Sequence, residues 1–278
     1  MGKGTLGEMS ERRKYDFVFS LGAACSCSQA LRLAGLQFAS YPFDWLYGGG
    51  LANRARLLVT DFAGWLDEAR LVKHDIDWKL EHEPYRNEDT GIVFKHDFDW
   101  NTPLSSSLPG VKAKYARRIK RLYERIEGAK RVLAVWINTP TSKRIGVEEA
   151  RKAHEMMAAH WPEAGIELLV LNCERGVGFE TRKDETQDGV RIIEYDYYDG
   201  REEFIDNEKM AKFLASEYCA DDYRSEQERK EWPRKRKLLK YATYNATTWL
   251  EYAINRWHYR MYRHFRKWIE KKGLSRLG

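Results

Sequence analysis

Short apolar runs alternate with longer helical stretches along most of this 278-residue chain, and this alternation limits the possible folds most strongly. The apolar runs have five to seven residues and a strand-like composition; they cover 16–22, 91–95, 131–137, 166–171 and 190–195. Helical spacing and composition are found over 23–33, 51–59, 62–71, 111–126, 147–160 and 202–218. Strands that alternate with such helices are joined by crossover connections. The sequence therefore predicts an α/β fold with a mainly parallel sheet and flanking helices.

The charge is distributed unevenly along the chain. Residues 224–278 contain 16 Lys or Arg against 5 acidic residues, although the whole chain has a formal net charge of only +6. Residues 1–223 are therefore mildly acidic, which argues against a nucleic-acid groove across this part. We expect a polar N-terminal tail over 1–15, an α/β domain of catalytic type over 16–223 and a basic helical extension over 224–278.

The basic extension is also rich in aromatic residues, which lie among its Lys and Arg side chains: Trp249, Tyr252, Trp257, Tyr259, Tyr262, Phe265 and Trp268. This composition is typical of an amphipathic helix on an anionic membrane surface. A helix that packs on the rest of the chain by its aromatic side has the same composition, and both interpretations stay open. Nucleic acid is the less favoured partner.

The sequence also indicates a cellular location. It has no run of about 18 apolar residues that would span a bilayer, and residues 1–15 lack the apolar stretch of a signal peptide. The four cysteines form no CxxC pair, so a zinc or thioredoxin-like site is not expected. We expect a cytoplasmic protein with reduced thiols, associated with the inner face of the membrane if the extension binds lipid.

Cys25 is the candidate nucleophile. It lies three residues after Gly22, where the first predicted strand gives way to a helix. A thiol in the first turn of a helix faces free N–H groups and the positive end of the helix dipole, and both favour the thiolate. The alternative is a small residue packed between helix and sheet. Cys27 points to another side of the same helix and cannot duplicate the role.

His96 directly follows the predicted strand 91–95, and functional side chains of parallel sheets lie at strand ends. A histidine there can take the proton from a thiol and return it later, although a loop histidine bonded to nearby carboxylates is the alternative. Asp97 and Asp99 form an Asp-x-Asp pair, which holds a divalent metal against a diphosphate in many sugar-nucleotide transferases. Asp97 can equally orient His96 or anchor a turn.

Four motifs occur in a fixed order over residues 17–100: Ser20-Leu-Gly-Ala-Ala-Cys25, Leu33-Ala-Gly-Leu36, Ser40-Tyr-Pro-Phe-Asp-Trp45 and Val93-Phe-Lys-His-Asp-Phe98. Together they resemble a bacterial family of unknown function described as papain-like cysteine peptidases, and the Pro-Phe-Asp-Trp block is the most specific part. The resemblance implies Cys25 as nucleophile and His96 as its base. It also implies that Asp44 and Trp45 are structural or lining residues, with Asp44 bonded to nearby backbone or to His96.

Three functions stay open at this point. The first, which follows the resemblance, is a papain-like cysteine peptidase or a related cysteine-dependent hydrolase or acyl transferase without a cofactor. In it, Asp97 or Asp99 supports His96, and Gly22, Asp44 and Trp45 lie at the substrate site. The second is a glycosyltransferase-like enzyme of surface polysaccharide synthesis at the membrane, using a sugar nucleotide and a divalent metal held by Asp97 or Asp99. The third is a non-catalytic protein that binds anionic lipid through its basic extension.

Overall fold

The computed structural model of the protein describes residues 12–74, 82–138, 143–174, 180–196, 207–227, 229 and 230. The chain divides into two compact units, Met1–Asp222 and Tyr223–Gly278. The fold described below is that of the first unit. The basic extension predicted over 224–278, with its membrane-binding role, lies almost wholly outside the described residues.

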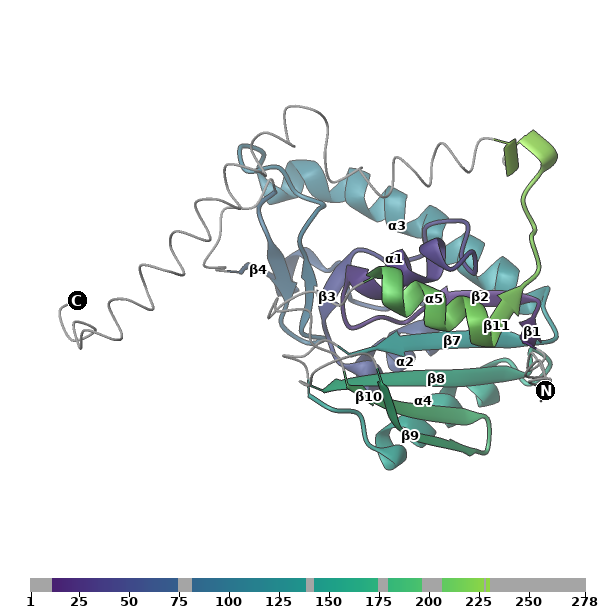
Figure 1. The fold of residues 1–278 in the computed structure, drawn as a ribbon. Coiled ribbons are helices and arrows are strands. Elements are labelled where there is room, and N and C mark those ends of the chain that lie inside the picture. Colours follow the sequence, from purple (N-terminus) through teal and green to yellow (C-terminus); the bar gives the residue numbers. More distant parts are fainter. Residues whose placement is uncertain are drawn as a thin grey trace, which may run out of the picture. The chain divides into compact units, whose positions relative to one another are not determined.

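A five-stranded sheet forms the centre of the first unit (Figure 1). Its strands lie in the order β2 (Phe17–Ser20), β7 (Val132–Ile137), β8 (Ile166–Glu174), β10 (Val190–Asp196) and β9 (Glu180–Gln187). The first four are parallel, and β9 runs antiparallel to β10 at the edge. The prediction of a mainly parallel α/β sheet is confirmed for this unit. The edge strand β9 was not expected, because all of its residues are polar or charged.

Two pairs of helices cover the two faces of this sheet (Figure 1). On one face lie α1 (Cys25–Leu33) and α5 (Asn207–Glu217), and on the other α2 (Leu51–Val59) and α4 (Val147–His160). The core between α1, α5 and the sheet is apolar and includes Val18, Cys27, Leu31, Leu133, Val135, Leu169, Met210 and Leu214. Among the helices that the structure describes, none is long and apolar enough to cross a bilayer.

A second, four-stranded antiparallel sheet is formed by strands within residues 46–94, which follow α1 in the chain. Its order is β3 (Leu46–Gly48), β6 (Ile92–Phe94), β5 (Tyr85–Asn87) and β4 (Leu71–Lys73). Only β6 was expected, because strands of three residues are too short to show a clear alternation. This sheet matters for the site, since β6 leads into His96 and pairs with β3, which follows the Pro-Phe-Asp-Trp block.

Two helices differ from the prediction. The helix predicted over 111–126 is longer: α3 (Leu104–Glu127) begins seven residues earlier and has Pro109 inside it. The helix predicted over 62–71 is wrong, since that segment forms turns, the short 3-10 helix η1 (Glu68–Arg70) and the start of β4. Asp61 and Phe62 have φ values of +51° and +54°, which an α-helix does not accommodate.

The beginning and the end of the first unit are joined by a small parallel sheet. β1 (Arg13–Tyr15) pairs with β11 (Tyr218–Ala220), and Tyr15 lies opposite Ala220 in the register. The aromatic rings of Tyr15 and Tyr218 are 6.2 Å apart at their centroids. This pairing holds α5 on the sheet at the side where α1 packs, because β11 directly follows α5.

Candidate functional site

The turn between β2 and α1 presents Cys25 as the first residue of α1. Gly22 in this turn has a φ of +48°, and a Cβ there would lie 3.0 Å from both the Ala24 carbonyl oxygen and Ser20 Oγ. A side chain would therefore be strained by the backbone conformation and crowded by two neighbours. Gly22 thus shapes the turn, and it is buried.

The environment of the Cys25 thiol opposes ionisation. The residue is only partly exposed. Burial raises the pKa of Cys25 above its ordinary value, while the Lys95 ammonium and the N–H groups at the start of α1 act in the opposite direction. The helix N-terminus therefore does not by itself make Cys25 a thiolate. A nucleophile in this place needs a base that takes its proton.

Cys27 has a different environment from Cys25. It is fully buried, its Sγ lies 3.4 Å from the Val135 carbonyl oxygen, and burial raises its pKa to about 12. Such a thiol packs as a small core residue and is not a second nucleophile.

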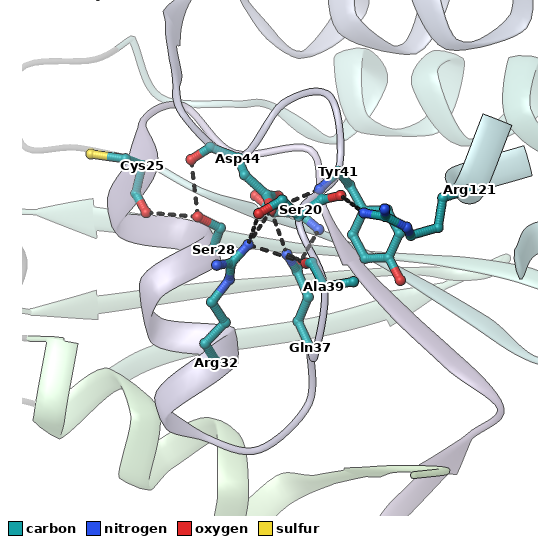
Figure 2. A network of polar contacts seen from close by, with 10 residues as sticks. Ser20, Cys25, Ser28, Arg32, Gln37, Ala39, Tyr41, Asp44 and Arg121 are labelled. Carbon is teal, nitrogen blue, oxygen red and sulfur yellow. Dashed lines mark hydrogen bonds and ion pairs between the residues drawn. The ribbon is translucent and has the colours of Figure 1, made fainter. Parts of the chain in front are cut away.

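Asp44 is fully buried beneath α1, at the centre of a polar network (Figure 2). Its Oδ2 accepts hydrogen bonds from Arg32 Nη2 at 2.5 Å, Gln37 Nε2 at 2.8 Å and the Tyr41 amide at 2.9 Å. Burial raises the pKa of Asp44, and these three contacts oppose that effect. The carboxylate therefore faces the interior of the fold, whereas the Cys25 thiol points away from the network (Figure 2).

The same network ties the Pro-Phe-Asp-Trp block to both β2 and α1. Gln37 accepts from the Ser20 amide at 3.1 Å, and Ser28 Oγ donates to the Asp44 carbonyl oxygen at 2.9 Å. Arg32 also lies over the Trp45 ring, 5.3 Å from its centroid, and Trp45 is partly buried. Through these contacts, Asp44 and Trp45 help to hold the chain around Cys25 in place.

A second buried arginine, Arg54 of α2, bonds directly to the Cys25 turn. Its Nη1 donates to the Leu21 carbonyl oxygen at 2.7 Å, and its Nη2 is 3.5 Å from the Ala23 carbonyl oxygen. Nη2 and Nε also donate to the Gly48 carbonyl oxygen, at 2.8 and 3.0 Å. Arg54 thus connects the end of β3 to the turn that presents Cys25.

Arg54 was not recognised as a site residue in the sequence, although a signal exists there. It occupies one position of the apolar stripe of α2, together with Leu51, Ala55 and Leu58. Its guanidinium is fully buried and lies over the rings of Phe43 and Trp136, at 5.4 and 5.7 Å. Burial lowers its pKa to about 10. A charged residue in an apolar stripe indicates a buried polar contact.

His96 is exposed and lies two residues after the end of β6. Its ring is 6.5 Å from that of His82, which was not recognised in the sequence. The neighbouring Lys95 places its Nζ 4.7 Å from the ring centroid of Tyr47 on β3, and its charge acts on Cys25. The end of β6 therefore lies near the thiol.

Asp97 and Asp99 have different surroundings. The Asp97 side chain is 2% exposed; it pairs with Lys114 and accepts from Tyr115 Oη at 3.0 Å, both on α3. The Asp99 side chain is 76% exposed, with its Oδ1 at 3.3 Å from His82 Nδ1. Asp97 thus anchors the segment after β6 to α3.

The positions of Asp97 and Asp99 do not add support to the hypothesis of a sugar nucleotide bound with a divalent metal. Within the described ranges, no group of three or more His, Cys, Asp or Glu residues is arranged to hold a metal ion. The use of a sugar nucleotide and a divalent metal stays a prediction.

Comparison with known proteins adds one finding. Residues 16–171 match the model of a family described as "Putative papain-like cysteine peptidase (DUF1796)". The matched segment begins just before β2 and ends within β8, so it includes both sides of the Cys25 turn and all of the four-stranded sheet. Neither the curated proteins nor the solved structures contain a match to the chain.

Proposed function

The chain belongs to this family, and on that premise we propose that it is a cysteine-dependent hydrolase or acyl transferase with Cys25 as nucleophile and His96 as general base. The observation that carries the proposal is the placement of Cys25. It is the first residue of a helix, on a turn that Gly22 shapes and Arg54 bonds.

The proposed reaction has two stages. His96 takes the proton from Cys25 Sγ, and the sulfur attacks the carbonyl carbon of the substrate. N–H groups at the start of α1 stabilise the negative charge that develops on the carbonyl oxygen. The bond to the leaving group then breaks, the leaving group takes the proton from His96, and a thioester to Cys25 remains. Water or another acceptor cleaves the thioester with His96 again acting as base.

The raised pKa of Cys25 supports the need for His96. Burial of the thiol favours its neutral form, so the attack on the carbonyl needs a base that takes the proton of Cys25. Catalytic hydrogen bonds are often long without substrate and tighten only when substrate is bound. An exposed His96 near the end of β6 is compatible with that behaviour.

The other site residues have supporting roles in this proposal. Asp97 holds the segment with His96 on α3 through Lys114 and Tyr115. Gly22 and Asp44 are buried and shape the site from within, whereas Trp45 retains some exposed surface that a substrate can contact. Asp99 is too exposed to hold a fixed orientation by itself, and its neighbour is His82.

Acyl-enzyme formation tests this proposal. The protein is incubated with p-nitrophenyl acetate, nitrophenolate release is followed, and the acetylated residue is located by mass spectrometry. We expect a burst and an acetyl group on Cys25, both lost in Cys25→Ala. Cys219→Ala is the matched control, because Cys219 is also a partly exposed free cysteine. An equal burst in Cys25→Ala would contradict the proposal.

A further inference from the structure

We infer that Arg54 is a positioning residue that fixes the Cys25 turn relative to the pair of strands from which His96 extends. The inference rests on the proposed function, because it concerns the relative placement of the proposed nucleophile and base. Arg54 belongs to neither element: it lies on α2, which follows β3 in the chain.

The hydrogen bonds of Arg54 define what it connects. All the hydrogen bonds of Arg54 that the structure describes are accepted by backbone carbonyl oxygens. Two acceptors, Leu21 and Ala23, lie in the Cys25 turn, and the third, Gly48, lies at the end of β3. The planar guanidinium has five N–H donors in a fixed geometry. Bonding to both segments at once therefore fixes their separation as well as their orientation.

The Gly48 end of this connection leads to His96. Gly48 pairs with Ile92 and Leu46 with Phe94, so β3 and β6 are adjacent, and the chain leaves β6 through Lys95 to His96. On the other side, the carbonyl oxygens of Leu21 and Ala23 flank Gly22, and Cys25 follows two residues after Ala23. Arg54 thus connects a point close to Cys25 with the strand beside β6.

The energetics of Arg54 point to the same role. A fully buried guanidinium without a carboxylate among its hydrogen-bond partners loses its hydration, and burial lowers its pKa to about 10. An apolar side chain of similar volume would fill the space between Phe43 and Trp136 without that cost. Because packing alone does not require a charge at this position, we attribute the arginine to its hydrogen bonds, which hold the Cys25 turn and β3 together.

The close packing at Gly48 provides an independent means of disturbing the connection. Gly48 has a φ of +72°, and a Cβ there would lie 2.6 Å from the Gly91 carbonyl oxygen. Gly48→Ala therefore displaces the Gly48 backbone and its carbonyl oxygen while Arg54 stays intact. Gly35 has a similar φ of +73° with no atom within 4 Å of such a Cβ, so Gly35→Ala is the matched control.

The test measures how strongly His96 and Cys25 depend on each other. Alkylation of Cys25 by iodoacetamide at pH 7 is followed by mass mapping in the wild type, His96→Ala, Arg54→Lys and the double variant. Lysine keeps the charge but cannot bond the turn and Gly48 together in the same geometry. We expect His96→Ala to slow the reaction by about tenfold in the wild type, because one unit of thiol pKa changes the thiolate fraction tenfold. In the Arg54→Lys background we expect little further slowing.

The outcomes separate this inference from the proposed function. If His96→Ala has no effect in the wild type, the proposed function fails. If it slows Cys25 equally in the wild type and in Arg54→Lys, this inference fails and the proposed function stands. Protection of the fully buried Cys27 reports that each variant is folded. If Arg54→Lys exposes Cys27, the test is repeated with Gly48→Ala in its place. The inference then requires that His96→Ala slows the alkylation of Cys25 less in the Gly48→Ala background than in the wild type, and by the same factor in the Gly35→Ala background as in the wild type.

Discussion

Two regions around Cys25 are each built on a buried arginine, and they differ in what the arginine contacts. Arg32 on α1 meets the carboxylate of Asp44 and contacts residues of the following loop. Within the described part of the chain, Arg54 on α2 donates its hydrogen bonds only to backbone carbonyl oxygens, and two of these belong to residues more than 30 positions away in the chain. The first region is a local ion pair that stabilises one loop. The second connects separate parts of the fold, so its main effect is expected on their relative placement.

The largest effect on stability is expected at the Arg32 ion pair. Asp44→Asn leaves the Arg32 guanidinium buried without a carboxylate, which costs about 3–5 kcal/mol of unfolding free energy. Urea unfolding measures the loss. The double variant Asp44→Asn with Arg32→Met, in which no charge is left unpaired, is expected to recover part of it. A loss below about 1 kcal/mol for the single variant would mean that the pair behaves like an exposed one.

Arg54→Met is expected to cost less, about 2 kcal/mol. The carbonyl oxygens of Leu21, Ala23 and Gly48 lose their donor, but a buried cation is removed at the same time. The same urea experiment gives the comparison with Asp44→Asn. If Arg54→Met proved the more destabilising of the two, Arg54 would be chiefly a stability residue.

Gly22→Ala tests the turn that both regions support. Its φ of +48° and the 3.0 Å approach to the Ala24 carbonyl oxygen lead us to expect a loss of about 1–2 kcal/mol. Because the turn carries Cys25, we also expect the alkylation rate of Cys25 to change. Gly35→Ala has the same backbone strain with open space around it, and should leave the Cys25 rate unchanged.

The smallest effects are expected at the two aspartates after β6. Asp97→Asn weakens the contact with Lys114 and is expected to cost about 1 kcal/mol, whereas Asp99→Asn should stay within about 0.5 kcal/mol. Thermal unfolding of the two variants side by side distinguishes the buried carboxylate from the exposed one. Equal losses would show that Asp97 does not anchor its segment.

The sequence indicated the parts of the fold whose residues have a clear period. The strand predicted over 131–137 is β7 within one residue, and the helix over 147–160 is α4 (Val147–His160). In the four-stranded sheet only β6 was predicted, from its apolar run, and the other three strands were missed because three residues are too few to show an alternation. The strand β9 was missed because an edge strand with polar residues has no apolar run.

The candidate site was predictable only where it depends on local pattern. Cys25 at the start of a helix follows from a strand, a glycine turn and a helix in sequence. The position of Arg54 in the apolar stripe of α2 indicates that it is buried. The partners of Arg54 and Lys95 lie on segments that are distant in the chain, and periodicity does not identify them. The partners of Asp97 lie on α3, in the helix that was expected, but the pairing with Lys114 and Tyr115 was not evident from spacing.

The central claim is that His96 activates Cys25, and its most direct test is the alkylation rate of Cys25 as a function of pH in the wild type and in His96→Ala. Burial raises the pKa of Cys25, and in our proposal a protonated His96 beside the sulfur opposes this effect. In His96→Ala, the rate should therefore rise only above the ordinary pKa of a thiol. In the wild type, we expect a rapid reaction already well below pH 8, with the buried Cys27 unreactive as the internal standard. Identical pH profiles in the two proteins would contradict the account.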